Sequence, residues 1–160
     1  AYDAEATLSA FDELREAGLT RHVGVSNFTP ELLVEARKLL DAPIVAHQVE
    51  CHPLLPQSEL VDIARETGHR LVAYSPLAQG ELLEHPEVRS VADDLGVTPA
   101  QAVLAWHLDR GIVPIPKARG NHVRENISAR AVEFTEEARR RLDGIEERRR
   151  VVDPDGAPWH

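Results

Sequence analysis

Residues 22–49 read HVGVSNFTPELLVEARKLLDAPIVAHQV, and this stretch decides the fold. The apolar alternation in 22–27 predicts a short buried strand and its exit. Thr29 is placed as the N-cap of a helix, and Pro30 occupies the first helical position. After Pro43 breaks the chain, residues 44–49 predict a second strand. The stretch therefore predicts one strand–helix–strand unit.

Predicted strands and helices also alternate on both sides of this strand–helix–strand unit. Helices are predicted at 3–17, 58–67, 86–95, 99–111, 123–129 and from Thr135, and strands at 71–74 and 112–115. Such alternation is typical of an α/β fold with a parallel sheet and right-handed crossovers. Four strands suit either a small open sheet or half of an eight-stranded barrel, which needs roughly 250 residues. We assign residues 1–150 to this domain and 151–160 to an irregular C-terminal tail.

Composition narrows the class of protein. The chain has 160 residues and a net charge of −9, which disfavours nucleic acid and anionic membranes as partners. No apolar run is long enough to cross a bilayer. A single cysteine, Cys51, cannot form an internal disulfide, so we expect a reducing, cytoplasmic location. The absence of methionine favours the half-barrel, as the back part of a longer polypeptide.

Ligands bind at the carboxyl ends of the strands in both architectures. The exits of the first three predicted strands carry amide and hydroxyl groups, and Tyr74 offers a flat face on which a ring could stack. These polar residues are Ser26, Asn27, Gln48, Ser75 and Gln79. They can recognise a carboxamide or a sugar.

The last exit is basic. Lys117, Arg119 and Arg124 lie close together with no acid among them, just before a predicted helix. Cations beside a helix N-terminus favour an anion, and a phosphate is the natural guest. A solvated basic loop is the alternative.

Other chemistries find little support. The chain has neither the G-x-G-x-x-G pattern of a Rossmann site nor a P-loop. His47, Cys51 and His52 do not have the spacing of a structural zinc site, so we predict no metal. Trp106 is predicted to pack in the core.

Four motifs occur in an order and at spacings that together are specific. They are Gly24-Val25-Ser26-Asn27-Phe28, Gln48-Val49-Glu50-Cys51-His52-Pro53, Tyr74-Ser75-Pro76-Leu77, and Ile115-Pro116-Lys117 followed by Arg124-Glu125-Asn126. With these motifs the chain resembles the aldo-keto reductase family. That resemblance implies a (β/α)8 barrel and reduction of carbonyl compounds with NADPH.

The resemblance also implies roles for individual residues. Ser26, Asn27 and Gln48 would hold the nicotinamide carboxamide, and Tyr74 would stack on the nicotinamide ring. The other half of the cofactor would meet Ser75, Leu77 and Gln79 along the pyrophosphate, Lys117 at the 2′-phosphate, and Glu125 and Asn126 at the adenine.

The last motif departs from the family pattern. Ala118 stands where the family often has serine, and His122 where it often has arginine. Arg119 could replace the missing cation, so we include His122 and Arg119 among the cofactor-binding candidates. We expect NADP(H) in preference to NAD(H).

The family's catalytic Asp, Tyr, Lys and His come from its first four strands, which this chain does not match. We therefore expect the cofactor-binding half of an oxidoreductase, with no catalytic residue of its own and a small carbonyl compound as the full-length enzyme's substrate. Two alternatives are a non-catalytic NADP(H)-binding module and an unrelated barrel enzyme for a phosphorylated substrate.

A half-barrel leaves unpaired strand edges. We expect exposed apolar side chains on its inward face, and association of the chain with itself or with an N-terminal half. The predicted inward side chains are Val25, Val45, Val49, Val72 and Ile115.

Overall fold

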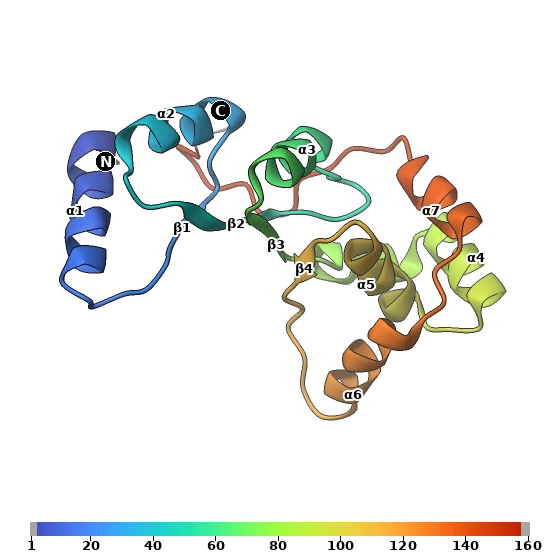
Figure 1. Cartoon of the computed structure of the whole chain (residues 1–160). Coiled ribbons are helices and arrows are strands. Elements are labelled where there is room, and N and C mark those ends of the chain that lie inside the picture. The colour runs from blue at the N-terminus through green and yellow to red at the C-terminus, as the bar shows by residue number, and fades with distance from the viewer. Residues whose placement is uncertain (1–2, 158–160) are drawn as a thin grey trace. The chain divides into compact units, whose positions relative to one another are not determined.

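The computed structural model describes residues 3–157, in which strands and helices alternate (Figure 1). The helices are α1 (Ala4–Glu16), α2 (Pro30–Leu39), α3 (Ser58–Thr67), α4 (Pro86–Leu95), α5 (Pro99–Asp109), α6 (Asn121–Ser128) and α7 (Glu136–Asp143). The strands are β1 (Val23–Ser26), β2 (Ile44–Glu50), β3 (Arg70–Tyr74) and β4 (Val113–Pro114), and two 3-10 helices are η1 (Ala78–Glu84) and η2 (Ala129–Ala131). The predicted α/β class is confirmed.

The chain divides into two compact units. Unit 1 contains residues 3–49, 58–71 and 156–157 of the described chain, and unit 2 contains residues 50–57 and 72–155. In unit 1, β1 and β2 pair in parallel. In unit 2, the end of β3 pairs in parallel with β4. Within the described residues, no helix combines the length and apolar character needed to cross a membrane.

Threonine caps start three of the helices, as the sequence predicts. The Thr29 hydroxyl accepts a hydrogen bond from the Leu32 amide at the start of α2. Thr98 and Gln101 form a reciprocal capping box at the start of α5. Each cap satisfies backbone N–H groups that have no partner inside the helix.

Unit 1 shows that part of the predicted inward face is wrong. Val25 and Val49 are only 8% and 3% exposed. Val25 lies opposite His47, which is also buried, whereas Ser26 lies opposite Gln48 and both are exposed. Side chains alternate along a strand, so the valines and the polar pair point to opposite faces. The open face at this point carries Ser26 and Gln48.

Unit 2 is organised around α5, whose central residues are buried. Trp106 is fully buried, which confirms its predicted place in the core. Its Nε1–H donates to Asp143 Oδ1 at 2.8 Å, and the Arg110 guanidinium lies 4.4 Å from the centre of its ring. Both α5 and α7 contact α4. The buried helix thus fixes the elements that surround the candidate site of this unit.

Three predicted boundaries in unit 2 are wrong. β4 contains only two residues, because Pro114 has no N–H to donate. Ile115, at 45% exposure, follows this short strand. Helix α6 begins at Asn121 rather than at residue 123. The predicted exit loop after Tyr74 continues into η1, which no helical periodicity announced.

Candidate functional site

The ends of β1 and β2 bring the first group of predicted residues together in unit 1. Ser26 Oγ donates to the Gln48 carbonyl oxygen at 3.0 Å, and the Asn27 amide donates to the same oxygen at 2.8 Å. The pairing of Ser26 with Gln48 places both side chains on one face. Ser26, Asn27 and Gln48 therefore form one uncharged polar cluster.

Asn27 contributes a buried acceptor to this cluster. Its backbone has a φ of 59°, a value that residues other than glycine seldom adopt. Its Oδ1 is buried and finds no hydrogen-bond partner among the described residues. The next amide, Phe28 N–H, donates to His47 Nε2 at 3.1 Å. An unpaired buried acceptor beside two other amide and hydroxyl groups suits the NH₂ of a carboxamide.

Unit 2 contains a pocket of about 840 Å³ at the exits of β3 and β4. The residues predicted to bind the phosphates and the adenine meet in its wall. They are Ser75, Leu77, Gln79, Lys117, His122, Glu125 and Asn126. The pocket gathers them from the turn after β3, from η1, from the loop after β4 and from α6.

One wall of the pocket has an unusual backbone. Ser75, Ala78 and Gln79 have φ values of 45°, 47° and 55°, all in the left-handed region. Such conformations persist only where the surrounding structure holds them, and they are common at ligand sites. The Ser75 carbonyl oxygen accepts a hydrogen bond from the Ala78 amide at 2.8 Å. This turn presents backbone groups and the Gln79 amide to the pocket.

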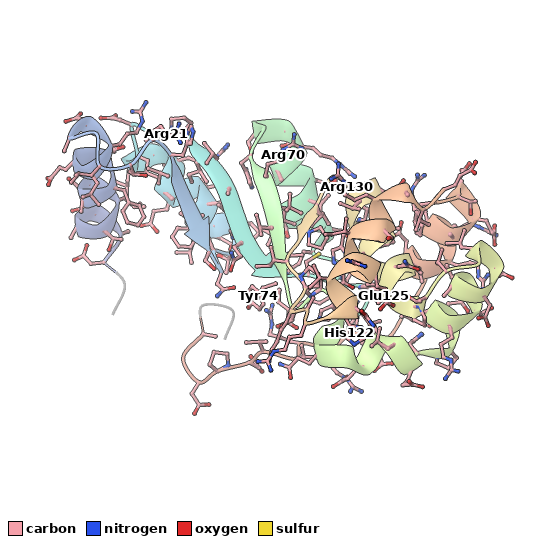
Figure 2. All side chains as sticks on the ribbon, turned by 90° about the horizontal axis from the view of Figure 1, so that it is seen from below. Arg21, Arg70, Tyr74, His122, Glu125 and Arg130 are labelled. Atoms are coloured by element: carbon pink, nitrogen blue, oxygen red, sulfur yellow. The ribbon has the colours of Figure 1, made fainter. Side chains whose placement is uncertain are left out.

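The opposite wall is formed by α6. Gly120 precedes it with φ 56° and ψ −127°, a conformation essentially restricted to glycine. His122 Nδ1 lies 3.1 Å from Glu125 Oε2, and both side chains extend from α6 (Figure 2). Hydrogen bonds from Thr98 and His122 lower the pKa of Glu125. The Gln101 side chain donates to the Glu125 carbonyl oxygen, which ties α6 to α5.

The pocket also holds a pair that the sequence did not reveal. Arg89 and Glu84 both line it, and their side chains form an ion pair at 2.8 Å. Both are largely exposed, so this pair is weak and leaves the guanidinium free to exchange partners. The pairing depends on η1, which brings Glu84 to the start of α4. No sequence pattern predicted that turn.

Other predicted residues lie outside this pocket. Arg119 and Arg124 are exposed and do not line it, so Lys117 is the member of the predicted basic trio that does. Tyr74 does not line the pocket either. It lies at the end of β3 away from Arg70 (Figure 2).

Also in unit 2, the exit of β2 contains a buried polar cluster. Glu50 and His52 are fully buried, and Glu50 Oε1 lies 2.9 Å from His52 Nε2. Burial raises the pKa of the Cys51 thiol to about 12, so this cysteine is not a thiolate nucleophile. Among the described residues, no three His, Cys, Asp or Glu side chains are grouped as a metal would require.

Comparison with known proteins places this arrangement. The profile of the aldo/keto reductase family matches residues 1–147. The chain belongs to the aldo/keto reductase family. An aldo-keto reductase of Mycobacterium sp. (strain KMS) is 40% identical over 149 residues, which are 91% of this chain and 53% of the relative.

Solved aldo-keto reductases share the fold. The aldose reductase of Giardia lamblia superposes with a TM-score of 0.89 at 27% identity, over 96% of this chain and 54% of that one. An aldo-keto reductase complexed with NADPH superposes with a TM-score of 0.82 at 30% identity, over 90% and 48%. The chain spans about half the length of the curated relatives it matches. The predicted half of a (β/α)8 barrel is thereby confirmed.

Proposed function

We propose that this chain forms the NADP(H)-binding half of an aldo-keto reductase that reduces aldehydes or ketones to alcohols. The observation that carries the proposal is the unit 2 pocket, which gathers seven of the predicted cofactor residues around Lys117. When bound, NADPH supplies the hydride that reduces the carbonyl carbon. The residues of this chain bind and orient the cofactor.

In unit 2, Lys117 binds the 2′-phosphate of the adenosine ribose as a point charge. His122 adds a hydrogen-bond donor there, and Arg119 adds positive charge from the loop that carries Lys117 without lining the pocket. Glu125 and Asn126 contact the adenine. Across the pocket, the turn with Ser75, Leu77 and Gln79 binds the pyrophosphate through backbone and amide groups. The charged donors favour NADP(H) over NAD(H).

In unit 1, Ser26, Asn27 and Gln48 hold the nicotinamide carboxamide. The unpaired Asn27 Oδ1 supports this role, because an acceptor in that position matches the carboxamide NH₂. For Tyr74, at the end of β3 in unit 2, the proposal rests on the family resemblance: it stacks on the nicotinamide ring and selects the face that donates hydride. The proton for the substrate oxygen comes from the family's catalytic tyrosine, in a part of the enzyme outside this chain.

A second candidate function follows from the same pocket. A chain that binds NADP(H) without turnover would be a non-catalytic binding module, and the absence of an assigned catalytic residue favours it. Family membership removes the reason for considering an unrelated barrel enzyme. We place either form in the cytoplasm on the basis of the single cysteine and predict that the chain alone self-associates.

Calorimetric titration of the 160-residue chain with NADPH tests the binding role. We expect saturable binding, and a chain that fails to bind NADPH would refute the proposal. Carbonyl-dependent oxidation of NADPH, measured after the chain is joined to an aldo-keto reductase N-terminal half, separates the two candidates. Turnover supports the reductase, and binding without turnover supports the module.

A further inference from the structure

Glu50 is a buried carboxylate for which the proposed cofactor site has no use. It is fully buried, and both of its oxygens accept hydrogen bonds from the C-terminal segment. Val151 N–H donates to Oε1 at 2.7 Å, and Val152 N–H donates to Oε2 at 3.0 Å. Burial raises the pKa of Glu50, but His52 and these two amides outweigh that effect, and the pKa is lowered. The group is therefore a charged anchor for residues 151–152.

The same segment is attached to the wall of the pocket. Gln79 Nε2 donates to the Val151 carbonyl oxygen at 3.3 Å, and the Arg149 guanidinium pairs with Glu81 at 2.7 Å. Gln79 and Glu81 both belong to η1, which lines the pocket. A further bond joins the Arg149 amide to the Leu54 carbonyl oxygen at 2.9 Å. Residues 149–152 thus connect the buried exit of β2 to η1.

The η1 segment needs such support. Ala78 and Gln79 hold left-handed backbone conformations without being glycine, which costs free energy unless neighbouring contacts compensate. The contact of Gln79 with Val151 is a long-range one that fixes the direction of its amide. Loosening Val151 would release that amide and let the turn relax away from the pocket.

We propose that Glu50 is a positioning residue for the cofactor pocket: it anchors residues 151–152, and this anchored segment holds η1 in its binding geometry. The coupling to NADPH rests on the proposed function, whereas the anchor itself does not. Since anchoring and cofactor binding share η1, each must strengthen the other by the same factor.

Two variants test the anchor, with a matched control. Glu50→Gln removes the negative charge and replaces one of the two acceptor oxygens with an NH₂ group, which cannot accept a hydrogen bond. Val152→Pro removes one donor without altering the buried residue. The control, Glu133→Gln, makes the same chemical change at an exposed position of unit 2 outside both η1 and the anchored segment. Circular dichroism first establishes that each variant is folded.

Limited trypsin digestion measures how firmly Glu50 holds the C-terminal segment. Residues 148–150 are arginines at the start of the anchored segment, and Arg21 in the exposed connection between α1 and β1 is the internal reference (Figure 2). At low trypsin, cleavage follows the fraction of open segment. We expect cleavage at 148–150, relative to Arg21, to rise at least about fivefold in Glu50→Gln and Val152→Pro, in the range typical of coupled sites. Glu133→Gln should change it less than about twofold.

Digestion in the presence of NADPH tests the coupling between the anchored segment and cofactor binding. Saturating NADPH should slow cleavage at 148–150 in the parent chain, and Glu50→Gln and Val152→Pro should weaken NADPH binding in calorimetry, because the two effects share one coupling. Unchanged cleavage in both variants would overturn the anchor. Increased cleavage with unchanged NADPH affinity would overturn the positioning role. A parent chain that does not bind NADPH would refute the proposed function and the coupling together, while the ligand-free digestion would still decide the anchor.

Discussion

The two units hold their candidate binding groups in different ways. In unit 1 the groups are uncharged, and the Gln48 carbonyl oxygen and the strand register fix their positions. In unit 2 the groups include Lys117 and Arg89 and line a pocket beside the buried helix α5. Neutral groups fixed by backbone suit a neutral carboxamide, and cations around a pocket suit phosphates. The difference is consistent with the separate roles that we propose for the two sets of residues.

The support of the unit 2 pocket is tested by Trp106→Ala. The indole is fully buried and donates to Asp143, so its removal leaves a cavity and an unpaired carboxylate. We expect a loss of about 3–5 kcal/mol in the free energy of unfolding, measured with urea. Leu108→Ala, at a 39% exposed position on the same helix, is the control and should cost far less. A loss below about 1 kcal/mol at Trp106 would show that α5 does not carry the pocket.

The support of the unit 1 cluster is tested by acid. Burial lowers the pKa of His47 to about 4, while the unfolded chain keeps a value near 6.5. The unfolded state therefore binds more protons between these values, and stability is lost as the pH falls through that window. Protonation of Nε2 also removes the acceptor of the Phe28 N–H.

We expect His47 to account for a loss of about 2 kcal/mol between pH 7.5 and pH 5 in urea unfolding. His47→Gln keeps an acceptor but does not titrate, so it should remove that share of the pH dependence. His22→Gln, at an exposed position of the same unit, is the control. An unchanged pH dependence in His47→Gln would contradict the claim that His47 is neutral and buried where it accepts a hydrogen bond from Phe28.

The charged character of the unit 2 pocket is tested by Lys117→Ala. Loss of one charge-assisted contact costs about 1.5–3 kcal/mol, so NADPH affinity should fall about 12- to 160-fold. NADH has no 2′-phosphate, and its affinity should change by less than about twofold. Arg130→Ala, an exposed cation outside the pocket, is the matched control in calorimetry. Equal losses of affinity for NADPH and NADH would contradict the assignment of the 2′-phosphate to Lys117.

The uncharged character of the unit 1 cluster is tested by Gln48→Ala. A neutral hydrogen bond contributes about 0.5–1.5 kcal/mol, so the affinity should fall about 2- to 12-fold. Both dinucleotides carry the same carboxamide, so NADPH and NADH should lose affinity equally. The control is Glu35→Ala, at an exposed position of the same unit. Gln57→Ala is not suitable, because the Gln57 side chain donates to the Glu50 carbonyl oxygen. A loss restricted to NADPH would contradict the assignment.

The sequence predicted the elements whose signals are local. Thr29 and Thr98 predict the starts of α2 and α5, because the capping hydroxyl and the following proline act within one helical turn. Seven of the predicted exit residues line the unit 2 pocket, whereas Arg119 and Tyr74 do not. The capping signals depend on residues only a few positions apart.

The sequence did not predict features that arise from distant contacts. Ser75, Ala78 and Gln79 take left-handed conformations without a glycine to signal them. The pairing of Arg89 with Glu84 needs the η1 turn, and the anchoring of Val151 by Glu50 joins positions far apart in the chain. The inward face was misjudged at Val25 because a one-residue shift in a strand exchanges its two faces.

The preference for the phosphate-bearing dinucleotide tests the central claim most directly. The dissociation constants of NADPH and NADH for the 160-residue chain, measured by calorimetry at low and high salt, are the required numbers. The account predicts that NADPH binds more tightly at low ionic strength and that its advantage shrinks as salt screens the exposed Lys117. Equal affinities at low salt, or an advantage that salt does not change, would contradict it.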